Sequence, residues 1–191
     1  MVKRCEWADS NPEMKEYHDK EWGIPEHNDY KLFELLVLEG MQAGLSWNTI
    51  LKKRRNFRNA FDNFDYNKIS NYSENEIEKL LQNEGIIRNR LKIQSVITNA
   101  KAFLKVIDQS GTFDKYIWSF VENKPIINHW KSLSDIPSKT GLSELISKDL
   151  KKRGFKFVGS TIIYAFMQAI GMVNDHLVSC FRHKAIINET S

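Results

Sequence analysis

Apolar residues recur along this chain at the three- and four-residue spacing of amphipathic helices, with few glycines and prolines between them. One helix is expected to begin at Asp29, its N-cap, and to break at Gly40. Ser46 is placed to cap a second, strongly basic helix, and Ser73 with Glu76 forms the capping-box pattern of a third. The pattern therefore predicts a chain built mainly from helices.

The second half of the chain continues in the same way. Further helices are expected from about Arg88 to Gly111, at 113–121, at 142–150 before Gly154, at 163–170 before Gly171, and from about Asp175 onward. Residues 123–140 contain two prolines and are expected to form a loop. The alternation of apolar and polar residues at 155–158 is too short to found a sheet. We therefore predict an all-α fold in one domain that spans residues 1–191.

Composition narrows the class of protein. Hydrophobic residues make up 41% of the 191 positions and charged residues 27%, which is typical of a globular protein and not of a disordered one. No run of about 18 apolar residues is present, so we expect neither a transmembrane helix nor a membrane partner. The N-terminus turns charged at once and lacks the apolar core of a signal peptide, so we expect a cytoplasmic protein.

Two cysteines, each with a histidine nearby, stand at opposite ends of the chain. Cys5 and His18 lie near the N-terminus, and His176 and Cys180 lie near the C-terminus. The second pair is spaced four residues apart, so a helix would place both side chains on one face. Two thiolates and two imidazoles satisfy a tetrahedral zinc ion and leave no open position, which predicts a structural site that joins the chain ends. Buried free thiols with surface histidines are the alternative.

Aromatic residues gather near the N-terminus, where Trp7, Tyr17, Trp22 and Trp47 all lie within the first 47 residues. Glu39 falls in the apolar stripe of its expected helix and should face inward, where a carboxylate is costly unless it finds donors or a cation. A buried glutamate beside aromatic rings suits a flat, cationic or donor-bearing ligand. The alternative is a frayed helix end that leaves Glu39 in solvent, with the tryptophans in the core.

Basic residues form two runs, at 52–55 and at 151–156. Both could contact phosphates, and glycine amides beside the second run could add donors. The net charge of +4 and the pI near 8.9 permit a polyanionic partner without requiring one. A solvated helix face is the alternative, because cations are favoured at helix C-termini in any case.

Longer motifs make the sequence recognisable. They are Arg-Cys-Glu-Trp at 4–7, Tyr-His-Asp at 17–19, Glu-Trp-Gly-Ile-Pro at 21–25, Leu-Glu-Gly-Met-Gln-Ala-Gly-Leu-Ser-Trp at 38–47, Gly-Ile-Ile-Arg at 85–88, Lys-Tyr-Ile-Trp-Ser-Phe at 115–120, Lys-Lys-Arg-Gly-Phe-Lys-Phe-Val-Gly at 151–159 and Val-Asn-Asp-His at 173–176. These motifs are collinear over nearly the whole chain. They resemble the DNA-3-methyladenine glycosylase I family of the helix-hairpin-helix superfamily.

The resemblance implies a helix-hairpin-helix DNA glycosylase fold with one structural Zn²⁺ per chain. Its four ligands would be Cys5, His18, His176 and Cys180. Two departures are visible. Residues 81–87 keep a single glycine where the superfamily's hairpin usually has two, and the superfamily's usual catalytic aspartate is absent from this family, so none is carried over.

The same resemblance implies a pocket for a base. Trp7, Tyr17 and Trp47 match the family's pocket rings, and Glu39 matches the carboxylate that reads the base, so Glu39 is the expected catalytic residue. The residues expected to contact DNA are Gly44 and Leu45, which match the loop that enters the duplex, together with Lys52, Lys53, Lys152 and Arg153.

The activity that the resemblance implies is base-excision repair. The chain would flip N3-methyladenine out of alkylated double-stranded DNA and hydrolyse its N-glycosidic bond, releasing free 3-methyladenine. It would act as a monomer. Two other functions remain open, namely a DNA-binding module that senses damage without excision, and a zinc-stabilised binder of a free purine or cationic ligand. Only the last predicts no salt-dependent affinity for DNA.

Overall fold

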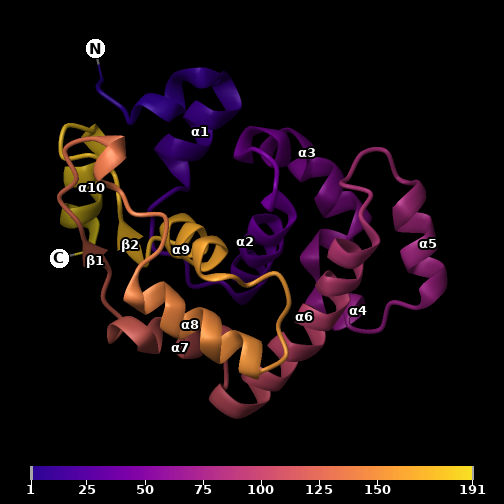
Figure 1. The fold of residues 1–191 in the computed structure, drawn as a ribbon. Coiled ribbons are helices and arrows are strands. Elements are labelled where there is room, and N and C mark those ends of the chain that lie inside the picture. Colours follow the sequence, from indigo (N-terminus) through magenta and orange to yellow (C-terminus); the bar gives the residue numbers. More distant parts are fainter. Residues whose placement is uncertain (1, 191) are drawn as a thin grey trace.

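The structure, a computed structural model, describes residues 2–190, with side chains for residues 2–189. Helices account for most of these residues, as the sequence predicts (Figure 1). The α-helices are α1 (Pro12–Lys20), α2 (Asp29–Gln42), α3 (Trp47–Ala60), α4 (Tyr66–Ile69), α5 (Glu74–Gln82), α6 (Arg90–Ser110), α7 (Phe113–Trp118), α8 (Gly141–Lys152), α9 (Ser160–Ala169) and α10 (Phe181–Thr190). Short 3₁₀ helices include η1 (Glu6–Ser10), η3 (Ser119–Val121) and η4 (Leu133–Asp135).

Helix α2 lies at the centre of the molecule and is buried on all sides. Every residue from Leu32 to Met41 is buried, and α2 packs against α3, α6, α7 and α9. A helix that is apolar all round is stable only in such a position. Because α2 is enclosed, any polar side chain on it must be paired within the protein or kept for a ligand.

Two details of α2 differ from the prediction. The N-cap is Asn28, whose side chain accepts hydrogen bonds from the first turn, so the helix begins at Asp29 itself. Gly40 does not break the helix, which continues to Gln42. A side chain at Gly40 would lie 3.3 Å from Cβ of Phe157, so this glycine lets the loop before α9 approach α2.

A tight hairpin joins α5 and α6. The Gly85 amide donates to the side-chain oxygen of Asn83, 2.9 Å away. From α3, the Lys53 ammonium donates to the carbonyl oxygens of Glu84 and Gly85, at 3.0 and 3.3 Å. A Cβ at Gly85 would meet Asn56 at 3.1 Å, which explains why the turn keeps a glycine here. The hairpin is thus fixed to α3.

Segments close to the two termini of the chain lie next to each other. Strands β1 (Ile126–Ile127) and β2 (Val173–Asn174) form a short parallel pair, which the sequence pattern was too brief to predict. Because residues 173–174 are extended, the last helix does not begin near Asp175 as expected but at Phe181. The amide of Phe181 donates to the carbonyl of Lys3, which ties the start of α10 to the N-terminal segment.

The other predicted helices agree with the structure within a few residues, whereas α1 and α4 were not predicted. Ser46 caps α3, Ser73 and Glu76 form the expected capping box, and Gly111 ends α6. The expected helix at 113–121 is α7 continued by η3. No helix in the described part of the chain combines the length and apolar character needed to cross a membrane.

Candidate functional site

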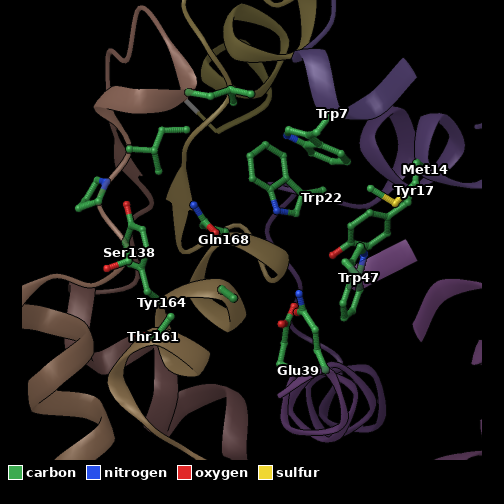
Figure 2. Close-up of a pocket in the computed structure, with 15 residues that line it drawn as sticks. Trp7, Met14, Tyr17, Trp22, Glu39, Trp47, Ser138, Thr161, Tyr164 and Gln168 are labelled. Atoms are coloured by element: carbon green, nitrogen blue, oxygen red, sulfur yellow. The ribbon is translucent and has the colours of Figure 1, made fainter. Parts of the chain in front are cut away.

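A cavity of about 460 Å³ opens between α1, the C-terminal half of α2, the start of α3, the segment 133–138 and one face of α9 (Figure 2). Its lining is mainly aromatic and apolar, with a few polar groups. The lining residues are Trp7, Met14, Tyr17, Trp22, Glu39, Gln42, Trp47, Leu133, Ile136, Pro137, Ser138, Thr161, Tyr164, Ala165 and Gln168. This combination is typical of a site for a flat organic ligand.

Four aromatic rings form one wall of the cavity. Trp7 packs edge-on against Trp22, with ring centroids 5.0 Å apart and planes at 83°. Tyr17 lies 5.3 Å from Trp47, and Trp7 lies 6.5 Å from Tyr17. The rings support one another, so the wall is held before any ligand arrives. In the described chain the buried Nε1 of Trp47 has no hydrogen-bond partner.

Glu39 extends from α2 toward the middle of the cavity, opposite these rings (Figure 2). Its side chain is only 4% exposed, and no hydrogen bond or charged partner for its carboxyl group is found among the described residues. Burial alone raises the pKa of Glu39 to about 8. The expectation that Glu39 faces inward is met, and the alternative of a frayed helix end is wrong.

Glu34 lies about one and a half turns earlier on the same helix and is a buried carboxylate with a structural role. It accepts hydrogen bonds from Arg54 at 2.7 Å and from Arg58 at 2.8 Å. Arg54 also bonds to Glu21, so this member of the basic run is committed to an internal ion cluster. Since two arginines pair with Glu34 and none of the described residues pairs with Glu39, Glu39 is the carboxyl group available to a ligand.

The opposite wall comes from one face of α9. Tyr164 and Gln168 both donate to Oδ2 of buried Asp175, at 2.6 and 2.8 Å. The other oxygen of Asp175 accepts from Asn128 and Trp130, both at 2.7 Å. This carboxylate therefore fixes two residues of the cavity wall and anchors the segment that precedes α8.

Next to the cavity, Cys5, His18, His176 and Cys180 come together with all four side chains buried. Their potential ligand atoms lie within 4.8 Å of one another. Sulfur-to-nitrogen distances are 3.4 Å for Cys180–His18, 3.6 Å for Cys180–His176 and 3.7 Å for Cys5–His176. Tetrahedral zinc with ordinary bond lengths requires about 3.6 Å between sulfur and nitrogen ligands, so the four residues fit a zinc ion.

The imidazole nitrogens that face away from the cluster are held by other groups. Nδ1 of His18 lies 2.7 Å from Asp19, which is itself held by Arg4. Nε2 of His176 lies 3.0 Å from the carbonyl oxygen of Trp22. These contacts leave Nε2 of His18 and Nδ1 of His176 facing the two sulfurs. Such outer contacts orient histidine ligands in metal sites.

The surroundings of the two thiols shift their pKa values in opposite directions. The hydrogen bond from Cys5 lowers the pKa of Cys180, with further contributions from the two histidines. That same bond, together with burial, raises the pKa of Cys5. These contacts favour the thiolate form of Cys180, and a thiolate is the form of cysteine that binds a metal ion.

Trp22 connects the cluster to the cavity. Its ring packs edge-on against His176, with centroids 4.6 Å apart, and against Trp7 in the cavity wall. Trp7 also contacts the His18 ring, at 5.1 Å. The Cys/His cluster thus supports the aromatic wall from behind.

Comparison with known proteins agrees with this geometry. Residues 7–183 match the methyladenine glycosylase family. The chain belongs to this family. It is 51% identical to DNA-3-methyladenine glycosylase 1 of Escherichia coli (strain K12), over 94% of this chain and 96% of that protein.

Solved structures of methyladenine glycosylases have the same fold. A crystal structure of 3-methyladenine DNA glycosylase I superposes with a TM-score of 0.90 at 53% identity, covering 94% of this chain and 98% of that one. Another, of a tyrosine-to-phenylalanine variant of the enzyme in complex with 3-methyladenine, superposes with a TM-score of 0.91 at 34% identity, covering 93% and 96% of the two chains.

In this member of the methyladenine glycosylase family, the four expected base-binding residues meet in one cavity. Trp7, Tyr17, Glu39 and Trp47 all line it. The four expected metal ligands also converge, although not in the expected way. His176 and Cys180 lie in a loop before α10, and it is the loop, not a shared helix face, that brings them together.

The residues expected to contact DNA are more dispersed. Gly44 and Leu45 form the exposed turn between α2 and α3, at the edge of the cavity that Trp47 lines. Lys52 is exposed, whereas Lys53 holds the α5–α6 hairpin. The remaining pair lies at the C-terminal end of α8, with Lys152 exposed and Arg153 bound to Asp149.

The sequence-based reasoning missed several residues of the site. Trp22 belongs to the aromatic residues near the N-terminus but is not among the predicted pocket rings, and Tyr164 and Gln168 lie outside every motif named above. A signal for the last two exists, because the face of α9 opposite its apolar core positions carries no charge. A helix face that is exposed to water usually carries charged residues. Asp175, buried beneath them, left no comparable signal.

Proposed function

We propose that this chain removes 3-methyladenine from alkylated double-stranded DNA by hydrolysing the N-glycosidic bond, as a single glycosylase domain. The observation that carries the proposal is Glu39, a buried carboxyl that no described residue pairs, facing an aromatic cavity large enough for a purine. Support also comes from relatives, one named as a DNA-3-methyladenine glycosylase and one solved in complex with 3-methyladenine.

The chemistry demands little of the protein at the leaving group. Methylation at N3 makes adenine cationic, so the base departs without being protonated by the enzyme. The remaining tasks are to extract the nucleotide from the duplex, to hold the base, and to stabilise the positive charge that develops on the sugar. A site with a buried carboxyl group and flat rings suits these tasks.

Glu39 provides both recognition and selectivity in this proposal. With a pKa of about 8, the carboxyl group is mainly neutral in the free protein at pH 7. A cationic base beside it favours the ionised form, because opposite charges stabilise one another in a buried site. Unmodified adenine is neutral and gains no such attraction, and its glycosidic bond is also harder to break.

The aromatic residues supply the contact area for the base. Tyr17 and Trp47 contact the purine ring, and Trp7 completes the wall. Burial, with the nearby Glu39, raises the pKa of Tyr17, so its hydroxyl keeps its proton and can donate a hydrogen bond. A cationic purine is attracted to such electron-rich rings as well as to the carboxylate.

The turn at Gly44 and Leu45 enters the duplex where the nucleotide leaves it, and Leu45, 42% exposed, fills the gap. We take the α5–α6 hairpin to be the helix-hairpin-helix element, with the proposed phosphate contacts Lys52 and Lys53 on the neighbouring α3. The other two proposed contacts, Lys152 and Arg153, lie at the far end of α6, where Arg153 donates to Gln109 at 2.8 Å. Binding should therefore weaken as salt rises. We further propose that the protein acts as a cytoplasmic monomer.

Cys5, His18, His176 and Cys180 would hold one zinc ion. Zinc with four protein ligands has no open position for a reacting group, so its contribution is structural. The ligands' role is to fix the N-terminal segment against residues 176–180 and to hold Trp22 and Trp7 in the cavity wall.

Chromatography of the free bases released from methylated duplex DNA tests the proposed activity. We expect release of 3-methyladenine and no release of unmodified adenine. Tight binding to methylated duplex without release of any base would contradict the proposal and favour a damage-sensing module. Binding of free 3-methyladenine without salt-dependent affinity for DNA would favour a small-molecule binder.

A further inference from the structure

Lys92, in the first turn of α6, is a buried lysine without an acidic partner. Its side chain is 7% exposed, and no carboxylate lies within ion-pair distance of its ammonium among the described residues. Burial lowers the pKa of Lys92. The ammonium instead donates to two carbonyl oxygens at the end of α2, those of Met41 at 2.8 Å and Ala43 at 2.7 Å. Burying an ammonium is costly, so these contacts need an explanation.

The second of these carbonyls belongs to the turn that precedes α3. Ala43 has φ −45° and ψ 116°, Gly44 has φ +77°, and the Leu45 amide donates to the carbonyl of Gln42 at 2.6 Å. These values define a type II turn with glycine at its third position. Type I and type II turns differ by a flip of their central peptide. The carbonyl of that peptide here is the one on Ala43, which Lys92 holds.

Because Lys92 holds this carbonyl, it also fixes which groups the turn presents to solvent. The Ala43–Gly44 peptide is trans, so its N–H points away from the carbonyl and from Lys92. Gly44 and Leu45 are both exposed, and the Gly44 amide has no backbone acceptor in the described part of the chain. One buried contact therefore fixes the direction of the Gly44 amide and the position from which Leu45 projects.

Lys92 also links this turn to the hairpin. Its own backbone amide donates to the side chain of Asn89, the N-cap of α6, at 3.1 Å. Its neighbour Leu91 is 69% exposed, the most exposed of the large hydrophobic side chains described. The lysine thus joins the turn at 43–45 to the start of α6. In the proposed function both of these surfaces face DNA.

We propose that Lys92 is a positioning residue that locks the Ala43–Gly44 peptide in its type II orientation, so that Leu45 projects into the duplex when the nucleotide is extracted. The inference rests on the proposed function, because it assigns the exposed turn to DNA. Lys92 touches neither the base nor the cavity. Its effect should therefore appear in the extraction of the nucleotide and not in binding of the free base.

The test uses a duplex with a tetrahydrofuran abasic analogue beside 2-aminopurine, whose fluorescence rises when it loses its stacking partner. With saturating wild-type protein we expect a rise, as Leu45 enters the stack. Lys92→Met should lose most of that rise and should slow release of 3-methyladenine from duplex by about tenfold to a hundredfold, the range for a misplaced positioning group. Affinity for free 3-methyladenine, followed by tryptophan quenching, should change by about twofold at most.

Two further variants separate positioning from general loss of structure. Lys101→Met, on an exposed position of the same helix, should behave as wild type in every assay. In Gly44→Ala the added Cβ meets no atom within 4 Å, so the substitution disturbs the turn only through the positive φ of this residue. It should reproduce the defect of Lys92→Met. The double variant should be no worse than either single variant, because both changes disturb the same turn. If Lys92→Met fails to fold, Lys92→Gln replaces it. This variant keeps a neutral hydrogen-bond donor, so the same losses of unstacking and excision are expected, with smaller magnitude.

The outcomes distinguish this inference from the proposed function. Wild-type unstacking and excision in a folded Lys92→Met variant would overturn the role of Lys92 and leave the glycosylase proposal intact. Equal losses in duplex unstacking and free-base binding would also overturn it, because they would show a general structural role. If wild type unstacks the duplex but releases no base, and Lys92→Met loses the unstacking, the excision activity would be overturned and the role of Lys92 would be supported.

Discussion

Glu39 and Glu34 lie on the same buried helix, but their carboxyl groups have opposite surroundings. Two arginines hold Glu34, whereas burial raises the pKa of Glu39 to about 8, with no partner among the described residues to offset the cost. A protein optimised for stability alone would not keep an unpaired carboxyl in its interior. The unfavourable placement is therefore explained by the cationic base that Glu39 is proposed to meet.

This placement has a consequence for stability. Because the folded-state pKa of Glu39 lies above the ordinary value of 4.5, the folded chain keeps a proton that the unfolded chain releases. Stability therefore falls as pH rises from about 5 toward 8, and Glu39→Gln should remove that dependence. We expect the free energy of unfolding of the variant, relative to wild type, to increase by on the order of 3 kcal/mol between pH 5 and pH 8.

Denaturant unfolding of both proteins at the two pH values measures this difference. Comparing the two proteins at each pH cancels the contribution of every other titrating group that they share. A relative stability that stays constant across this range would mean that Glu39 titrates normally, and that the pocket solvates its carboxyl group.

For single residues, the sequence predicted the structure where the chemistry of the side chain and the spacing of apolar residues pointed to the same role. The register of Glu39 among leucines predicted its burial, and the rarity of cysteine pointed to Cys5 and Cys180 as partners. Asp19, which orients His18, could not be found in this way. An aspartate on a helix surface looks the same in sequence whether it faces solvent or a histidine.

At the scale of elements, the turns and close approaches position the site more than the helices themselves. The turn after α9 is the clearest case. Gly171 has φ +70°, and a Cβ there would lie 2.3 Å from the carbonyl carbon of Ile24 and 2.4 Å from the nitrogen of Pro25. This contact presses the segment after α1 against the end of α9, close to both the cavity and the Cys/His cluster.

We predict that Gly171→Ala destabilises the protein by more than about 2 kcal/mol, because it combines backbone strain with a clash against main-chain atoms that cannot move aside. Gly141→Ala is the matched control, since a Cβ at this first position of α8 meets nothing within 4 Å. Its effect should be neutral or a gain of about 0.5 kcal/mol. Midpoints of denaturant unfolding measure both, and equal midpoints for the two variants would contradict the role of Gly171.

Helix positions followed from the sequence because apolar spacing and caps are local signals. The exceptions were set by long-range packing. Gly40 appeared to end α2, but it is retained because Phe157 packs against it. The pairing of β2 with β1 keeps residues 173–174 extended and delays α10 to Phe181, and no local signal could have predicted that pairing.

On the scale of the whole molecule, the Cys/His cluster connects the two chain ends and the cavity. Its four residues come from both termini, and Trp22 links it to the aromatic wall. Removing a metal ion from such a site should release both ends together. The base pocket would lose the support behind Trp7 and Trp22 as a result.

We predict that the purified protein carries about one equivalent of zinc per chain and that a strong chelator lowers its Tm, with recovery on adding zinc back. Each kcal/mol lost should lower Tm by about 2–4 °C in a chain of this size. Metal analysis combined with thermal unfolding provides the measurement. Protein purified without chelators that holds no zinc, or whose Tm ignores the chelator, would show that the cluster is a set of buried thiols and imidazoles.

The overall all-α class and the convergence of the chain ends were both predictable from sequence. The cavity was predictable only in part, because its second wall comes from α9 and from residues 133–138, which share no motif with the aromatic residues near the N-terminus. Walls contributed by distant segments are defined by tertiary packing. Resemblance to a family supplied the substrate class, which spacing and composition alone could not.

The central claim is that Glu39 reads a cationic base in this cavity. Its most direct test is single-turnover release of 3-methyladenine from methylated duplex DNA by wild type, Glu39→Gln and the control Glu13→Gln, which alters an exposed carboxylate on α1. We expect Glu39→Gln to be slower by about a hundredfold or more, as for the loss of one electrostatic contact to a transition state, and the control to match wild type. Release by a folded Glu39→Gln variant at the wild-type rate would contradict the claim.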